Sequence, residues 1–265
     1  MTSLSPIFLS HGSPMIMLDP SPAHDFLRGL QGITGRPDFI IVVSAHWESH
    51  GLKVTGSPAP KTIHDFGGFD PRLHQMTYPA AGDPQLAADI QAVLGQAGIA
   101  IAVDPLRGLD HGAWIPLKLA FPEADIPVLQ ISIPKTSSPR DLYAVGKALS
   151  PILGDKGLLI GSGSFTHNLY EFKGQELDAI PAPWVTAFAE WMNAKIAAND
   201  VEALLNYREM APYARENHPT EEHLLPLFAA MGAGIGNHES ITSSTLHRSY
   251  HHSILAMDAY SFRGK

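Results

Sequence analysis

The chain contains no cysteine among its 265 residues. This absence excludes disulfide bridges, thiolate metal sites and cysteine nucleophiles. Basic charge is also scarce, because 18 lysines and arginines stand against 26 aspartates and glutamates, for a formal net charge of −8. Such a chain lacks the basic footprint of a protein that binds nucleic acid or an anionic lipid surface, so we expect neither partner.

Long apolar runs are absent as well. No run approaches the roughly 18 residues of a membrane span, and residues 1–10 lack the basic start of a secretory signal. We therefore expect a cytoplasmic protein without a membrane segment. No Ser/Gly-rich tract, charge block or repeat divides the chain, which predicts one domain over residues 1–265. No sequence feature specifies an oligomeric state.

Short apolar runs rich in β-branched residues predict buried strands. They occupy residues 7–9, 39–43, 99–103, 127–133 and 158–160. Helical patterns lie between them, and Asp83-Pro84 and Ser138-Pro139 each combine an N-cap residue with a proline at the first helical position. Strands that alternate with helices predict an α/β fold with a central, mainly parallel sheet flanked by helices.

Histidine is the residue type in excess, with 14 copies. His11 and His46 follow the first two predicted strands, and His167 comes shortly after the strand at 158–160. Each alone is more simply a loop histidine bonded to the backbone. Three together at strand ends favour a site at the carboxyl ends of the strands, where α/β sheets bind ligands. Neutral imidazoles suit Zn or Fe.

The segment Thr220-Glu221-Glu222-His223 offers a further ligand. Thr220 is a predicted helix N-cap, and glutamates in a first helical turn stabilise the helix without any function. His223 shares a side with Leu227 and is expected to turn inward, whereas Glu222 would complete a two-histidine, one-carboxylate triad. Both residues stay open as ligands at this stage.

The segment 62–69 sets His64 and Asp65 beside paired glycines and two aromatic residues, Phe66 and Phe69. This composition favours a loop that lines a pocket for an aromatic substrate. A plain turn would explain the glycines but not the aromatic pair.

His111 follows Asp110 and is a candidate to hydrogen-bond a substrate or polarise an oxygen. The alternative is a structural pair in which Asp110 orients His111. Trp47, Trp114 and Tyr78 are candidates to line the same pocket by their positions near the motifs.

The sequence does not match several common catalytic motifs. In Gly161-Ser162-Gly163 the third glycine of a dinucleotide fingerprint would be residue 166, which is threonine. The serine position of a hydrolase elbow falls on Gly163. His-Glu-x-x-His and Walker A sequences are absent.

Together the segments resemble the class III extradiol ring-cleavage dioxygenases of the LigB superfamily, especially the branch of DOPA 4,5-dioxygenases. The resemblance runs from Phe8 to about Leu255. Its motifs are 10–14 (Ser-His-Gly-Ser-Pro), 44–47 (Ser-Ala-His-Trp), 63–69, 110–112, 166–169 and 219–223. It implies one divalent ion, Fe(II) for catalysis, with Zn(II) plausible as the bound ion.

The resemblance also implies roles. His11 and His46 match the two family ligand histidines, and His223 matches a further ligand of the DOPA branch. His167 matches the acid/base histidine and is a further candidate ligand, and His111 matches a histidine near the substrate and oxygen. The broader superfamily has a glutamate as its third ligand, which keeps Glu222 open.

The resemblance implies that the function is 4,5-cleavage of a DOPA-like catechol with O₂. The substrate would be a small aromatic diol, with His64, Phe66 and Trp47 as expected contacts. Two alternatives belong to other classes: a zinc-dependent hydrolase that uses the same histidines, and a non-catalytic, Memo-like binding protein. The complete set of ligand candidates and the aromatic Phe66/Phe69 loop count against the second alternative.

Overall fold

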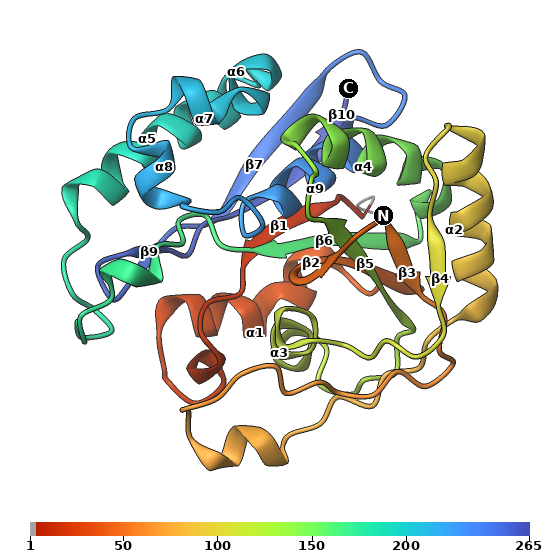
Figure 1. The fold of residues 1–265 in the computed structure, drawn as a ribbon, viewed down its shortest axis with the longest axis horizontal. Helices are drawn as coiled ribbons and strands as arrows, with labels where there is room; N and C mark the ends of the chain where they lie inside the picture. Colours follow the sequence, from red (N-terminus) through yellow and green to blue (C-terminus); the bar gives the residue numbers. More distant parts are fainter. Residues whose placement is uncertain (1–3) are drawn as a thin grey trace.

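The computed structural model describes residues 4–265, and its centre is an eight-stranded sheet of order β4-β3-β5-β2-β6-β1-β10-β7. The four central strands run parallel, and they are β5 (Val128–Pro134), β2 (Phe39–Ser49), β6 (Gly157–Gly163) and β1 (Ile7–Ser10). Their apolar runs are buried, which is typical of parallel strands covered on both faces. The predicted α/β fold with a mainly parallel central sheet is confirmed (Figure 1).

The outer strands make the sheet mixed. On one side lie β3 (Lys53–Thr55), antiparallel to β5, and β4 (Ala102–Asp104), parallel to β3. On the other side lie β10 (Ala259–Gly264), antiparallel to β1, and β7 (Ile241–His247), antiparallel to β10. A separate pair is formed by β8 (Tyr250–His251) and β9 (Leu255–Ala256).

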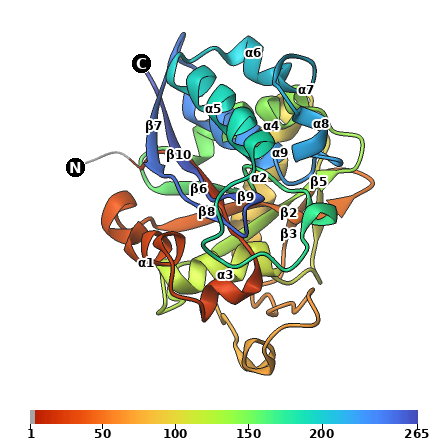
Figure 2. The same cartoon turned by 90° about the vertical axis from the view of Figure 1, so that its left-hand side faces the viewer.

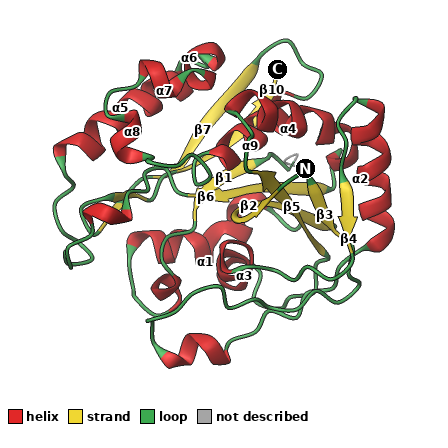
Figure 3. Cartoon of the chain, in the orientation of Figure 1, coloured by secondary structure: helices red, strands yellow, loops and turns green. Residues whose placement is uncertain are grey.

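Helices cover both faces of the sheet (Figures 1 and 3). One face carries α2 (Pro84–Gln96), α4 (Pro139–Leu153), α5 (Pro183–Ala197) and α9 (Leu225–Ile235). The other face carries α1 (Pro22–Thr34) and α3 (His111–Ala120). Each face therefore has its own hydrophobic core, and the sheet separates the two.

Shorter helices complete the fold. Three of them join α5 to α9, and they are α6 (Val201–Leu205), α7 (Tyr207–Met210) and α8 (Ala214–Asn217). Three 3₁₀ helices are η1 (Pro14–Met17), η2 (Pro71–Gln75) and η3 (Leu169–Glu171). The view at right angles shows α5 to α8 on one side of the sheet and α1 with α3 on the other (Figure 2). None of the helices in residues 4–265 has both the length and the apolar character needed to cross a bilayer.

Both predicted helix starts are confirmed. The Asp83 carboxylate accepts from Leu86 N, and Ser138 forms a reciprocal capping box with Asp141.

The predicted start at Thr220 is wrong, because α9 begins only at Leu225, with Pro226 in its first turn. The carboxylates that precede it have other partners: Tyr207 Oη donates to Glu221, and His223 contacts Glu222.

Two strand boundaries also differ from the predictions. The amide of Ile99 still closes the end of α2 by donating to Leu94 O, so β4 starts at Ala102. The second strand does not end at residue 43 but continues to Ser49, so His46 lies within β2 rather than after it. Its pairing with β5 skips between Val43 and Glu48, an irregularity that can redirect the side chains between them.

Candidate active site

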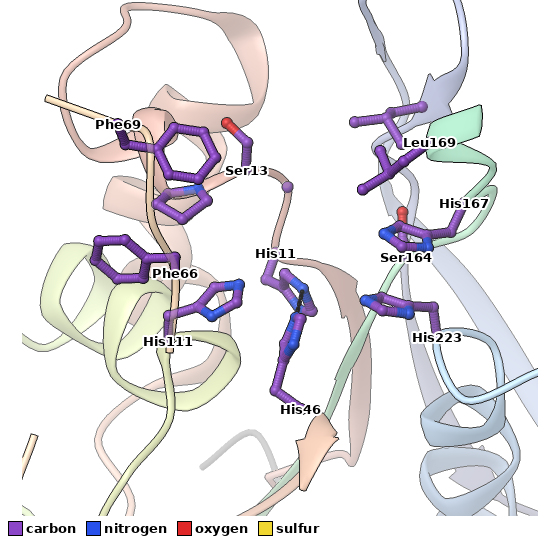
Figure 4. Close-up of a pocket in the computed structure, with 13 residues that line it drawn as sticks. His11, Ser13, His46, Phe66, Phe69, His111, Ser164, His167, Leu169 and His223 are labelled. Atoms are coloured by element: carbon purple, nitrogen blue, oxygen red, sulfur yellow. Dashed lines mark hydrogen bonds between the residues drawn. The ribbon is translucent and has the colours of Figure 1, made fainter. Parts of the chain in front are cut away.

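Five histidines line one pocket at the carboxyl edge of the parallel strands, and they are His11, His46, His111, His167 and His223 (Figure 4). The cavity volume of the pocket is about 170 Å³, which is below the range of roughly 300–1,000 Å³ typical of drug-sized ligand sites and suits a small ligand. The sequence prediction that strand ends deliver histidines to one edge agrees with this geometry.

His11 follows β1 directly, and its amide donates to Gly163 O at 2.9 Å, which fixes the backbone against β6. Its Nδ1 lies 3.0 Å from Ser162 Oγ. The Ser162 hydroxyl donates to Gly112 O, so it accepts from His11 and places the imidazole proton on Nδ1. The Nε2 of His11 is thereby left with a free lone pair.

The Nε2 of His46 faces the Nε2 of His11, and the two nitrogens lie 3.0 Å apart. Two ligands about 2.1 Å from one ion and at right angles would lie about 3.0 Å apart. Gly112 makes room for this ring, since a Cβ at that position would lie 2.9 Å from His46 Cδ2. The spacing of the two nitrogens therefore fits a shared divalent ion.

His223 supplies a third nitrogen. Its Nδ1 lies 2.8 Å from Glu222 Oε1, while its Nε2 is buried and has no hydrogen-bond partner among the described residues. The candidate ligand atoms of His11, His46 and His223 all lie within 4.8 Å of one another. A buried nitrogen without a partner is unfavourable, and an ion at this point would satisfy it.

Glu222 contacts the outer side of His223 rather than facing His11 and His46. Its Oε1 meets His223 Nδ1 and also accepts from the Thr220 hydroxyl at 3.1 Å. A carboxylate in this position fixes the tautomer of a ligand histidine and raises its basicity. The geometry thus favours His223 as the ligand and Glu222 as its support.

His167 is stacked on His223, with ring centroids 3.5 Å apart and planes inclined by 9°. Burial lowers the pKa of His167 to about 4, although the nearby Glu222 charge opposes the shift. The imidazole is therefore neutral at pH 7 and can accept a proton. Burial, followed by the neighbouring imidazoles, also lowers the pKa of His11 and His223 far below its ordinary value.

Asp65 links the loop at 62–69 to two of the histidines. Its Oδ1 accepts from the His111 amide at 2.9 Å and lies 3.0 Å from His111 Nδ1, while Oδ2 lies 3.9 Å from His46 Nδ1. Burial acts to raise the pKa of Asp65, but the contacts with His111 outweigh it and lower the value to about 2. The sequence drew attention to Asp65 within its motif without assigning it a role.

Asp110 is buried and caps α3, but it does not pair with His111, so the alternative of a structural Asp110–His111 pair is wrong. Its carboxylate accepts from Ser44 Oγ at 2.7 Å and from Arg107 Nη2 at 3.0 Å. Arg107 also donates to His46 O at 3.3 Å. This network joins the bulged part of β2 to the start of α3, and sequence inspection missed the contribution of Arg107.

The expected substrate contacts divide into two groups. Phe66 and Phe69 line the pocket. His64 lies behind Phe66, with ring centroids 5.8 Å apart, and its Nε2 is 2.9 Å from Met76 O. Trp47 lies outside the pocket and packs against Arg107, whose guanidinium is 5.2 Å from the ring centroid.

Trp114 and Tyr78 are also absent from the pocket wall. Trp114 Nε1 donates to Ile63 O at 2.9 Å, and the Tyr78 hydroxyl donates to Phe121 O at 3.1 Å. Both are fully buried in the core beneath the loop, so they support the wall rather than form it.

The rest of the wall is apolar or carries hydroxyl groups. Beside the two phenylalanines it includes Pro14, Leu169 and Leu255. Leu169 belongs to one of the motifs quoted above, but nothing in the sequence separates Leu255 from an ordinary core leucine. Its place in the pocket depends on a contact between distant parts of the chain.

Comparison with known proteins identifies the family of this chain. The sequence pattern described as "Catalytic LigB subunit of aromatic ring-opening dioxygenase" matches residues 6–257. The chain belongs to the LigB family. A relative named 4,5-DOPA dioxygenase extradiol from Beta vulgaris is 39% identical to this LigB-family chain over 259 residues, which is 96% of this chain and 95% of the relative.

Further comparisons agree. A 4,5-DOPA dioxygenase extradiol of Escherichia coli K12 is 37% identical over 91% of this chain and 89% of its own. A crystal structure of an uncharacterized protein from Escherichia coli K12 superimposes with a TM-score of 0.79 at 31% identity, covering 98% of this chain and all of that one. This LigB-family chain is an extradiol ring-opening dioxygenase, and such enzymes depend on a metal and act on aromatic substrates with O₂.

Proposed function

We propose that the enzyme opens the ring of a catechol at an extradiol bond, with a divalent ion held by His11, His46 and His223. The observation that carries this assignment is the convergence of three candidate ligand nitrogens within 4.8 Å of one another beside a stacked, neutral His167. The names of the curated relatives support 4,5-cleavage of a ring with a substituent para to one hydroxyl, as in DOPA.

The donor set fits Fe(II) or Zn(II), because neutral imidazoles bind both. We propose Fe(II) as the catalytic ion, since Zn(II) has no redox chemistry to offer O₂. A bound Fe(II) would lower the pKa of a coordinated catechol hydroxyl and bring the two reactants into contact. The His11–Ser162 and His223–Glu222 contacts occupy Nδ1 of each ring and would leave the Nε2 lone pairs free to bind the ion.

His167 is the proposed general base. Its ring stacks on the His223 ring, so it lies beside the proposed ligand. With a pKa of about 4 it is unprotonated at neutral pH and can accept the hydroxyl proton of the substrate. A neutral base of this kind contributes typically 10²–10⁴-fold to a rate.

His111 is the proposed partner for negative charge that develops on oxygen. It opens α3 and lines the pocket; its amide donates to Asp65 Oδ1, and its Nδ1 lies 3.0 Å from the same oxygen. Phe66 lies 5.6 Å from the His111 ring and forms a flat wall for the aromatic ring of the substrate.

The test is anaerobic loading of the purified protein with Fe(II), followed by L-DOPA, caffeate, protocatechuate and 4-methylcatechol in air. We expect oxygen uptake and a new visible absorbance with at least one catechol, and neither with the zinc-loaded protein. An iron-loaded protein that consumes no oxygen with any catechol would overturn the proposal. Ester or amide hydrolysis by the zinc form, independent of O₂, would replace it with a hydrolase.

A further inference from the structure

The wall of the pocket carries no side chain with a full charge to meet a charged substituent. Among residues 4–265, the lining set contains no lysine, arginine, aspartate or glutamate. Its polar members are the five histidines on the floor and two serines. Asp65, Glu222 and Arg107 lie close by, but each contacts a histidine from behind rather than lining the pocket.

The two hydroxyl groups have contacts of their own. Ser164 donates its proton to Thr166 O at 2.7 Å, so it cannot donate to a substrate without losing that bond. Ser13 accepts from Met15 N at 3.3 Å, which leaves one free hydroxyl proton. A carboxylate prefers several donors, and one neutral hydroxyl would satisfy it poorly.

The remaining wall is apolar. Pro14, Phe66, Phe69, Leu169 and Leu255 make up this part, which we term the mouth. In the close-up, Phe69 and Leu169 lie on opposite sides of the pocket (Figure 4). Both lie farther from His46 than the other four histidines of the pocket do. Their side chains reach solvent, with exposed fractions of 37% for Phe69 and 57% for Leu169.

A catechol bound through its hydroxyl oxygens at the floor would direct its para substituent away from the ion and toward the mouth. A charged substituent that lies between Phe69 and Leu169 would lose part of its water and gain no ionic partner, which is costly. An uncharged, apolar substituent would gain from the removal of its surface from water. Arg107, which lies behind His46, is already bonded to Asp110 and His46 O.

We infer that the preferred substrates are catechols whose ring substituent is uncharged, such as alkylcatechols, rather than the zwitterionic amino acid DOPA. This inference rests on the proposed function and narrows it to a substrate class. The inferred substrate preference of this chain differs from the one that the names of its DOPA dioxygenase relatives specify, although the sequence identity to them reaches 39%.

The first experiment compares four catechols of similar length with the iron-loaded enzyme: 4-ethylcatechol, 3-(3,4-dihydroxyphenyl)propionate, dopamine and L-DOPA. They present a neutral, an anionic, a cationic and a zwitterionic substituent. We expect kcat/KM for 4-ethylcatechol to exceed the other three by about tenfold or more, because an unpaired charge is hard to desolvate. Equal or faster turnover of any charged catechol would overturn the inference, whereas no turnover of all four would overturn the proposed function instead.

The second experiment places a charge in the mouth. Leu169→Arg adds a cation at a half-exposed position outside the histidine cluster, and Leu169→Gln is its uncharged control of similar length. We expect only the arginine variant to raise the kcat/KM ratio of the propionate to 4-ethylcatechol, by several-fold, with the gain reduced by salt. If both variants change this ratio equally, the substituent does not face Leu169 and the inference fails.

Discussion

The floor and the mouth of the pocket are built in different ways. The floor consists of five histidines, and two of its proposed ligands, His11 and His223, are oriented by hydrogen bonds that they donate to Ser162 and Glu222. The mouth consists of apolar side chains from the loop at 62–69, the 3₁₀ helices η1 and η3 and strand β9, and it is placed by packing. The difference teaches that this fold can separate the choice of reaction from the choice of substrate.

The two regions also differ in their response to substitution. A floor residue acts through geometry fixed to tenths of an ångström, so its loss should affect catalysis by orders of magnitude. A mouth residue contributes contact area, so its loss should alter selectivity by a modest factor.

The largest effect is expected from removing a proposed ligand. His46→Ala should abolish tight metal binding and lower kcat/KM by on the order of a thousandfold or more. Metal content after gel filtration, together with oxygen uptake, measures both. His64→Ala is the matched control, because that ring lies behind Phe66, and it should retain its metal. A His46→Ala protein with a full equivalent of iron would remove His46 from the ligand set.

Replacement of His167, the proposed base, should lower the turnover rate without removing the metal. His167→Gln should keep its iron and lower kcat by about 10²–10⁴-fold, because no neutral imidazole remains to accept the proton. Single-turnover absorbance with 4-ethylcatechol measures the step. If the variant instead loses its iron in parallel with its activity, His167 is a ligand before it is a base.

Asp65→Asn should have an intermediate effect. The amide can still accept from the His111 backbone, but it no longer carries the charge that lies near His46 and His111. We expect a loss of about 10–100-fold in kcat/KM with the fold intact. Asp70→Asn is the control, because that carboxylate is also in this loop region but pairs with Arg72. Similar losses in both variants would point to loop disruption.

Acid should destabilise the metal-free protein through its buried histidines. Besides the site histidines, His218 is fully buried, with its Nε2 3.0 Å from Phe165 O. Burial lowers the pKa of His46 and His218 to about 3 and that of His167 to about 4, below the ordinary value of 6.5. The unfolded chain therefore takes up protons first, so stability is complete above pH 6.5 and falls as pH drops toward these folded-state values. Urea midpoints at pH 8, 6.5 and 5 measure this. Equal midpoints at pH 8 and pH 5 would contradict the assignment of neutral buried rings.

The smallest effect is expected at the mouth. Phe69→Ala removes a ring that is already 37% exposed, so it should raise KM for 4-ethylcatechol by less than about tenfold and leave kcat nearly unchanged. Steady-state oxygen uptake separates the two constants. A fall in kcat as large as that of the floor variants would mean that the mouth also positions the reacting groups.

Sequence inspection could find the floor because its histidines sit beside recognisable strands. His11 follows a four-residue buried run, and His167 follows the Gly157–Gly163 strand by four residues. It could not decide between Glu222 and His223, because neighbouring side chains diverge according to the local turn, and Thr220 did not cap the helix as expected. The strands β7 and β10 were missed because their residues are less uniformly apolar than those of the centre.

The mouth and the supporting contacts were harder to predict. Arg107, Ser162 and Leu255 act through partners that are distant in the sequence, and no local pattern records such pairings. The role of Asp65 depends on how the loop docks against the start of α3. Local signals therefore located the reactive groups, while the orientation of those groups required the packed structure.

The missing side chain at Gly163 has a consequence for the position of the proposed ligand His223. The Ser164 amide donates to His223 O at 2.8 Å, and a Cβ on Gly163 would lie only 2.0 Å from that oxygen. The separation between the sheet and the chain that carries the third imidazole is thus set by main-chain contact, not by rotamers. The backbone of His223 is held against β6, so only rotation of its side chain can adjust the distance from the ring to a bound ion.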